Sequence, residues 1–134
     1  MRQLDSFADA RLIVGCLYCG GLQETREHVP SKVFLDRPFP SYLPIVGACQ
    51  QCNSGFSLDE EYLACLIECA MHGTTVPNHL ERTRVAKALQ HSPGLRVRLE
   101  GAKYEQNGRT CFFPEDDRVK RVIAKLALGH SVFE

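Results

Sequence analysis

Apolar residues recur every three or four positions between Leu58 and Met71, which is the spacing of a helix with one buried face. The members of this stripe are Leu58, Tyr62, Cys65, Leu66 and Cys69. Ser57 stands three residues before Glu60, which is the capping-box pattern of a helix start, and Gly73 is placed to end the helix. The pattern therefore predicts a helix from about Leu58 to Met71.

A second helix with a thinner apolar face is predicted after Pro77. Asn78 would cap it, Glu81 would be the reciprocal partner of that cap, and Ser92-Pro93-Gly94 would end it. The segment 95–102 then fits two structures. Alternation favours a strand with one face formed by Leu95, Val97 and Leu99. A helix that starts at Ser92-Pro93 would instead share one stripe among Leu95, Leu99 and Ala102.

Asn107-Gly108 is a strong hairpin signal, and the residues from Thr110 to Phe113 would form its second strand. An amphipathic helix is predicted after it, acidic at its start and ended by Gly129. Its apolar stripe consists of Val119, Val122, Ile123 and Leu126. The chain is thus predicted to mix helices with short strands.

With 134 residues, 44% hydrophobic and 24% charged, the chain is expected to form a single soluble domain, residues 1–134. No apolar stretch approaches the roughly 20 residues that cross a bilayer, so a cytoplasmic protein without a membrane partner is expected. Sixteen basic residues balance sixteen acidic ones. Any affinity for nucleic acid must therefore come from a local patch.

The cysteines form two Cys-x-x-Cys pairs, which are Cys16 with Cys19 and Cys49 with Cys52. Two such pairs supply the four thiolates of a tetrahedral, structural zinc site, and the cytoplasm disfavours disulfides. One structural Zn²⁺ is predicted. Cys65 and Cys69, with His72 three residues further on, could make a second site, but buried core thiols are the preferred interpretation. Cys111 is also read as a core residue.

The sequence Arg26-Glu27-His28-Val29-Pro30 lies between the pairs, and Asn53 directly follows the last cysteine. On these residues the segment from Cys16 to Asn53 resembles the treble-clef, zinc-bound HNH nucleases. The longer stretch from Glu27 to Glu68 looks like a group of bacterial HNH-like proteins. The resemblance implies an α+β fold, with a treble-clef (ββα-metal) zinc core at about 11–57. Residues 58–134 would form a helical covering region with a small hairpin.

The resemblance also implies roles for three residues. His28 would be the general base, since an imidazole can take a proton from water near neutral pH. Glu27 and Asn53 would offer oxygen ligands to one catalytic Mg²⁺ or Mn²⁺. This predicts an HNH-type endonuclease that hydrolyses phosphodiester bonds of nucleic acid, with DNA as the favoured substrate.

A second function stays open, namely a catalytically silent treble-clef module that binds a protein or a nucleic-acid partner. The family's middle asparagine is missing, because no asparagine lies between His28 and Cys49. Phosphate contacts could come from the final helix through Arg118, Lys120, Arg121 and Lys125. The earlier helix could add Arg82, Arg84 and Lys87, although a solvated helix surface also explains these charges.

Overall fold

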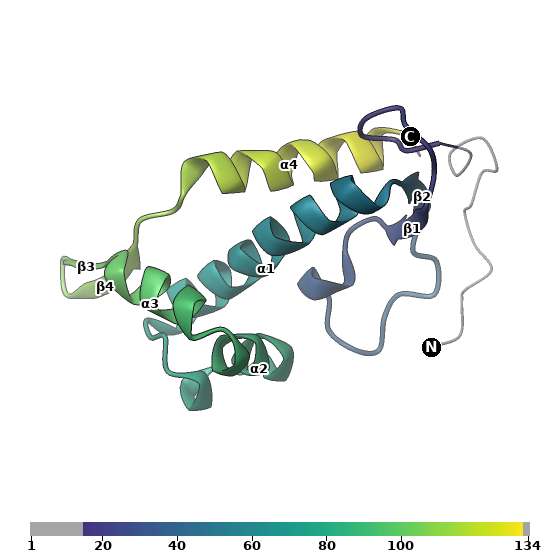
Figure 1. The fold of residues 1–134 in the computed structure, drawn as a ribbon. Coiled ribbons are helices and arrows are strands. Elements are labelled where there is room, and N and C mark those ends of the chain that lie inside the picture. The colour runs from purple at the N-terminus through teal and green to yellow at the C-terminus, as the bar shows by residue number, and fades with distance from the viewer. Residues whose placement is uncertain (1–14, 133–134) are drawn as a thin grey trace.

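One long helix, α1 (Gln50–His72), organises the chain in this computed structural model, which describes residues 15–132. The hairpin of β1 (Thr25–His28) and β2 (Ile45–Ala48) lies at its start. Around it lie η2 (Lys32–Phe34), η3 (Pro77–His79), α2 (Thr83–His91), α3 (Pro93–Gly101), β3 (Lys103–Gln106), β4 (Arg109–Phe112) and α4 (Asp116–Ser131). Figure 1 shows α4 running beside α1, with α2, α3 and the β3–β4 hairpin toward the far end of α1. The predicted α+β class is confirmed, while residues 11–14 of the predicted zinc core lie outside the described part.

Helix α1 begins at Gln50, eight residues before the predicted start. Cys49 is its N-cap, because the Cys49 sulfur accepts a hydrogen bond from the backbone N–H of Cys52 at 3.3 Å. The capping-box interpretation of Ser57 is therefore wrong, and Ser57 lies inside the helix. The predicted end is confirmed, since Gly73 takes a left-handed conformation with φ 66° directly after His72.

The strands β1 and β2 pair antiparallel, with Thr25 opposite Ala48 and Glu27 opposite Val46. All four residues of β2 are buried, whereas in β1 only Glu27 is buried. Successive side chains of a strand point to opposite faces. Glu27 and His28 therefore leave the same strand on opposite sides.

The second predicted helix starts later than expected, because residues 77–79 form the single turn η3 and α2 begins at Thr83. The buried carboxylate of Glu68 in α1 accepts hydrogen bonds from the backbone N–H groups of Glu81 and Arg82, at 3.1 and 3.2 Å. The Glu68 side chain from α1 thus satisfies the backbone N–H groups just before α2. The sequence had predicted a local cap, Asn78, for the start of this helix. The predicted end of α2 before Ser92 is confirmed, since the helix ends at His91.

The undecided segment is helical, since α3 spans Pro93–Gly101 with Pro93 at its first turn. Leu99 is fully buried and Val97 is 70% exposed, which matches the helical stripe and not the strand alternation. The hairpin prediction is confirmed: Asn107 and Gly108 have φ of 52° and 75° and join β3 to β4.

Helix α4 exists as predicted, and most of its predicted apolar stripe is confirmed. Val122 is fully buried and Val119 packs against buried apolar residues of the other helices, whereas Ile123 is 56% exposed. The face toward the rest of the protein also carries Arg118, Lys125 and Gly129, which the prediction did not include. Gly129 does not end the helix. A Cβ atom there would lie 3.0 Å from a methyl group of Val29, so glycine allows α4 to approach the end of the first hairpin.

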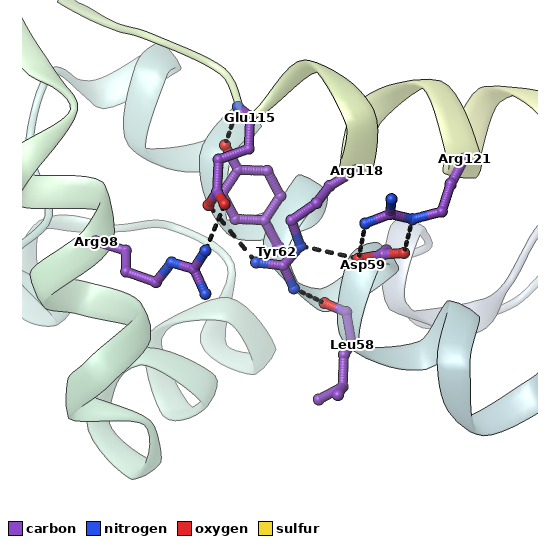
Figure 2. A network of polar contacts seen from close by, with 7 residues as sticks. All are labelled: Leu58, Asp59, Tyr62, Arg98, Glu115, Arg118 and Arg121. Carbon is purple, nitrogen blue, oxygen red and sulfur yellow. Dashed lines mark hydrogen bonds and ion pairs between the residues drawn. The ribbon is translucent and has the colours of Figure 1, made fainter.

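A polar network joins α1 to α4 (Figure 2). The carboxylate of Asp59 accepts hydrogen bonds from Nε of Arg118 and of Arg121, each at 2.8 Å. The Arg118 guanidinium also lies over the Tyr62 ring at 4.4 Å, and the Tyr62 hydroxyl accepts the backbone N–H of Glu115 at 2.8 Å. These contacts satisfy the backbone N–H of Glu115 just before α4 and tie α4 to α1.

The apolar core lies toward the far end of α1. Its fully enclosed members come from α1, α2 and α3, and they are Tyr62, Ala64, Cys65, Leu66, Cys69, Val85, Leu89 and Leu99. The interpretation of Cys65 and Cys69 as core thiols is thereby confirmed, whereas Cys111 is only half-buried. No helix within residues 15–132 is long and apolar enough to cross a membrane.

Candidate metal centre and adjoining pocket

The first cysteine pair sits on a tight backbone turn. Gly15 bridges to Leu22, the N–H of Cys16 donates to the carbonyl of Gly21, and the N–H of Gly20 donates to the carbonyl of Cys16. Gly20 has φ of 78°, a conformation that glycine adopts without strain. The turn directs both sulfur atoms of the pair toward the second pair.

The second pair lies at the junction of β2 and α1, where Cys49 caps the helix and Cys52 lies in its first turn. The sulfur atoms of Cys16, Cys19, Cys49 and Cys52 all lie within 4.8 Å of one another. Zinc–sulfur bonds of about 2.3 Å in a tetrahedron place the sulfurs about 3.8 Å apart. The observed separation of 3.7 Å between the Cys19 and Cys49 sulfurs agrees with that value. The cluster can hold a zinc ion.

The backbone around Cys16 favours its ionised form. Burial opposes ionisation of this thiol, but hydrogen bonds from the backbone of Cys49, Cys19 and Tyr18 outweigh burial and lower the pKa of Cys16 to about 6. A thiolate is the form that binds metal. The local backbone thus suits a sulfur ligand.

Next to the cysteine cluster, a buried lysine joins two carboxylates. Nζ of Lys125 lies 2.5 Å from Oε1 of Glu27 and 2.5 Å from Oε1 of Glu60, and it also donates to the Ser31 hydroxyl at 3.1 Å. Glu27 is 8% exposed and Glu60 is 2% exposed. With both glutamates ionised, the three groups carry one net negative charge in a low-dielectric environment, which attracts a further cation.

The second oxygens of these carboxylates are the unusual feature. Oε2 of Glu27 and Oε2 of Glu60 are both buried, and neither has a hydrogen-bond partner within residues 15–132. Burial raises the pKa of Glu27, the Lys125 ammonium lowers it, and the Glu60 carboxylate raises it again, so that the net shift is upward. Buried oxygens without donors are suitable ligands for a metal ion or a proton.

Glu27 and Asn53, two of the three predicted site residues, line one pocket of about 210 Å³. They come from β1 and α1, and Ser57, Glu60 and Glu61 line the same pocket. The Asn53 amide donates to the Thr25 hydroxyl at 3.3 Å, which ties the start of α1 to β1. A pocket of this size suits a hydrated ion and one small polar group better than a large organic ligand.

His28 is not in that pocket. It lies on the other side of β1 in a shallow crevice with Tyr18, Pro30 and Lys125, and Ser31 lines both the crevice and the pocket. Burial, helped by the charge of Lys32, lowers the pKa of His28, and its Nδ1 is buried without a partner in the described chain. The lowered pKa favours the neutral imidazole, which has an unprotonated nitrogen that can accept a proton.

The predicted nucleic-acid contacts on α4 are mostly engaged inside the protein. Arg118 and Arg121 pair with Asp59, and Lys125 is buried between Glu27 and Glu60. The apolar stripe had suggested that these side chains point into solvent, but the helix presents Arg118 and Lys125 to α1. Of the four, only Lys120 is exposed and without an ion pair among residues 15–132.

Glu60 and Lys125 are the functional candidates that sequence reasoning misread. Glu60 stood in the supposed capping box, and Lys125 was taken for a surface charge. Lys125 lies three residues after the buried Val122 and four before the buried Gly129, and this spacing is a signal that it belongs to the buried face. Comparison with protein-family models, with curated proteins and with solved structures finds no match to the chain.

Proposed function

We propose that the chain is a metal-dependent endonuclease that hydrolyses phosphodiester bonds of nucleic acid, with DNA favoured, on a zinc-stabilised treble-clef core of the HNH kind. The observation that supports this most is the shared pocket of Glu27 and Asn53. Glu27 lies between the two cysteine pairs in the sequence, and Asn53 directly follows the second pair. The HNH resemblance assigns both residues to the catalytic cation. Their meeting in one pocket is what that assignment requires.

The donor set of the pocket fits a hard divalent cation. Glu27 and Glu60 contribute buried carboxylate oxygens that have no hydrogen-bond partner within residues 15–132, and Asn53 contributes an amide oxygen. Mg²⁺ or Mn²⁺ bound by these oxygens would supply charge stabilisation for the phosphate oxygens during hydrolysis. Lys125 keeps the two carboxylates together through their other oxygens.

His28 would accept the proton of the attacking water. The water oxygen forms a bond to phosphorus, the bond from phosphorus to the departing sugar oxygen breaks, and the water proton passes to the neutral imidazole. The lowered pKa keeps His28 unprotonated at neutral pH. Ser31 lines both the crevice of His28 and the pocket, so the two hollows share this residue.

The test is a cleavage assay with plasmid DNA, single-stranded DNA and RNA in the presence of Mg²⁺ or Mn²⁺. We expect wild-type protein to nick at least one substrate, and His28→Ala to lower the rate by about 10²–10⁴-fold without a change in zinc content. Asn53→Ala should lower the rate, and a higher Mn²⁺ concentration should partly restore it. The matched control is His91→Ala at the exposed end of α2, which should cleave like wild type.

A specific observation favours the second candidate, a catalytically silent zinc module. The Lys125 ammonium already lies against both carboxylates, where it can serve as a built-in cation in place of a metal. If wild type cleaves none of the substrates with either cation, or if His28→Ala cleaves as well as wild type, the silent module replaces the nuclease. Lys125→Met then separates the roles, because a purely structural ion pair predicts a loss of stability without any gain of Mn²⁺ binding.

A further inference from the structure

A larger groove of about 930 Å³ adjoins the pocket of Glu27 and Asn53. It runs between the loop 32–39 and the start of α2, and Lys32 and Arg84 line both the groove and the pocket. The two hollows are therefore neighbours that share these two side chains. A ligand lying in the groove would therefore lie next to the pocket of Glu27 and Asn53.

Because the chain has no net charge, it needs a local basic patch to bind nucleic acid, and the groove is such a patch. Its basic lining residues are Lys32, Arg37, Arg82, Arg84 and Lys87, against acidic Asp36 and Glu81. Arg82 pairs with Asp36 at 2.8 Å and donates to the carbonyls of Val33 and Leu35, so it holds the loop in place. Four basic side chains remain to face a ligand, with one acidic residue opposing them.

Phe39 supplies an aromatic surface in the same groove. Its ring is half-buried, and Nζ of Lys32 and Cζ of Arg37 lie 5.6 and 5.8 Å from its centre. An aromatic ring flanked by cations is what proteins use to stack an unpaired base while they hold its phosphates. The bases of a duplex are already stacked on each other and cannot use such a ring.

We infer that the groove binds a single strand of nucleic acid, with phosphates along Lys32, Arg84 and Lys87 and a base stacked on Phe39. This inference deepens the proposed function and rests on it, because it names the form of substrate that reaches the pocket. It also moves the nucleic-acid surface from α4, where the arginines pair with Asp59, to the loop 32–39 and α2.

The test is fluorescence anisotropy with labelled 12-nucleotide dT and rU strands and a 12-base-pair duplex, without added divalent cations, over a range of NaCl concentrations. We use His28→Ala protein as the parent to prevent cleavage. We expect the strands to bind more tightly than the duplex. The double variant Arg84→Gln/Lys87→Gln should bind at least about tenfold more weakly, with a salt slope reduced by about 1.4.

Phe39→Ala should weaken strand binding about fivefold or more and leave the salt slope unchanged. The control is Lys120→Gln on α4, which removes one exposed basic charge outside the groove and should bind like the parent. The inference would be overturned if the duplex bound more tightly than the strands, or if Lys120→Gln lost as much affinity as the groove variants. It would also be overturned if poly-glutamate bound as tightly as the strands. Comparison of the dT strand with the rU strand distinguishes binding of DNA from binding of RNA.

Cleavage and binding fail separately in these experiments. If the strands bind through the groove but wild type never cleaves them, the proposed hydrolysis is wrong and the inferred strand binding is kept. If wild type cleaves while Arg84→Gln/Lys87→Gln and Phe39→Ala cleave and bind as well as wild type, the groove is wrong and hydrolysis stands.

Discussion

The two ends of α1 are held together by different chemistry. Around the start of the helix, the buried apolar cluster consists of Cys16, Ala48 and Cys49, with Tyr18 and Cys52 packed against it, and three of these five residues belong to the four-cysteine set. At the far end, eight buried residues from three helices form an extended core. One end thus gathers four cysteines that can hold a zinc ion, and the other end depends on apolar burial.

The seam between α1 and α4 adds a third kind of contact. It combines ion pairs with the buried Val122, and the pairs run from Arg118 and Asp59 at one end to Lys125 with Glu27 and Glu60 at the other. Such pairs contribute little net stability but cost much when one partner is removed. The difference teaches that the acidic pocket lies where these polar contacts meet the apolar core, since Ala64, Cys65 and Val85 of that core line it together with Glu27 and Glu60.

The largest effect is expected from Cys49→Ala. The variant should bind no stoichiometric zinc and lose more than about 4 kcal/mol of stability, because metal binding to four thiolates is coupled to folding. Metal analysis and thermal melts check this. Cys111→Ala removes a half-buried thiol outside the cluster and should keep one zinc per chain. Wild-type protein that contains no zinc and still melts cooperatively would contradict the claim that zinc stabilises the region around the start of α1.

Leu89→Ala should cost about 2–5 kcal/mol, because Leu89 is 1% exposed in the far core and its truncation leaves a cavity. Zinc content should not change, since the side chain lies in the other cluster. Denaturant unfolding with metal analysis measures both. The exposed Val97→Ala is the control and should change stability by less than about 0.5 kcal/mol. Loss of zinc from Leu89→Ala would mean that the two ends are not separate.

Asp59→Asn tests the seam and should cost about 1–3 kcal/mol at pH 7, because it leaves Arg118 and Arg121 without their charged partner. Hydrogen bonds from Arg121, and less strongly from Arg118, lower the pKa of Asp59. The ionised carboxylate therefore adds stability above the unfolded aspartate pKa of about 3.9, and this is lost as pH falls through the lower folded pKa. Melts between pH 7 and 2 should show the variant and wild type converging in acid. A constant difference would assign the effect to packing.

What the sequence could predict differs between these regions for a physical reason. The cysteine cluster, the Gly73 helix end and the Asn107-Gly108 hairpin rest on local spacing and backbone conformation, so residues near in sequence were sufficient. The start of α1 was wrong because Cys49 is both a member of the cluster and a helix cap, and a sulfur cap is not part of the usual pattern.

The remaining errors come from contacts between residues far apart in the chain. Glu68 satisfies backbone donors thirteen and fourteen positions away, and Lys125 finds Glu27 across 98 positions. Neither partner is close in the sequence, so α2 was started too early and the pairing of Lys125 with Glu27 was not predicted. The pocket of Glu27 and Asn53 was implied by the HNH resemblance alone, and Glu60 joins it only through the folding of α1.

Hydrogen exchange with and without zinc tests the difference between the two ends most directly. We predict that a high-affinity zinc chelator removes the protection of β1, β2 and the first turns of α1, while α2, α3 and the last turns of α1 keep theirs. Cys111→Ala, measured in parallel, should respond in the same way as wild type. Unchanged protection in β1 and β2 after zinc is removed, or equal loss in α2 and α3, would contradict a metal-held end beside an independently packed core.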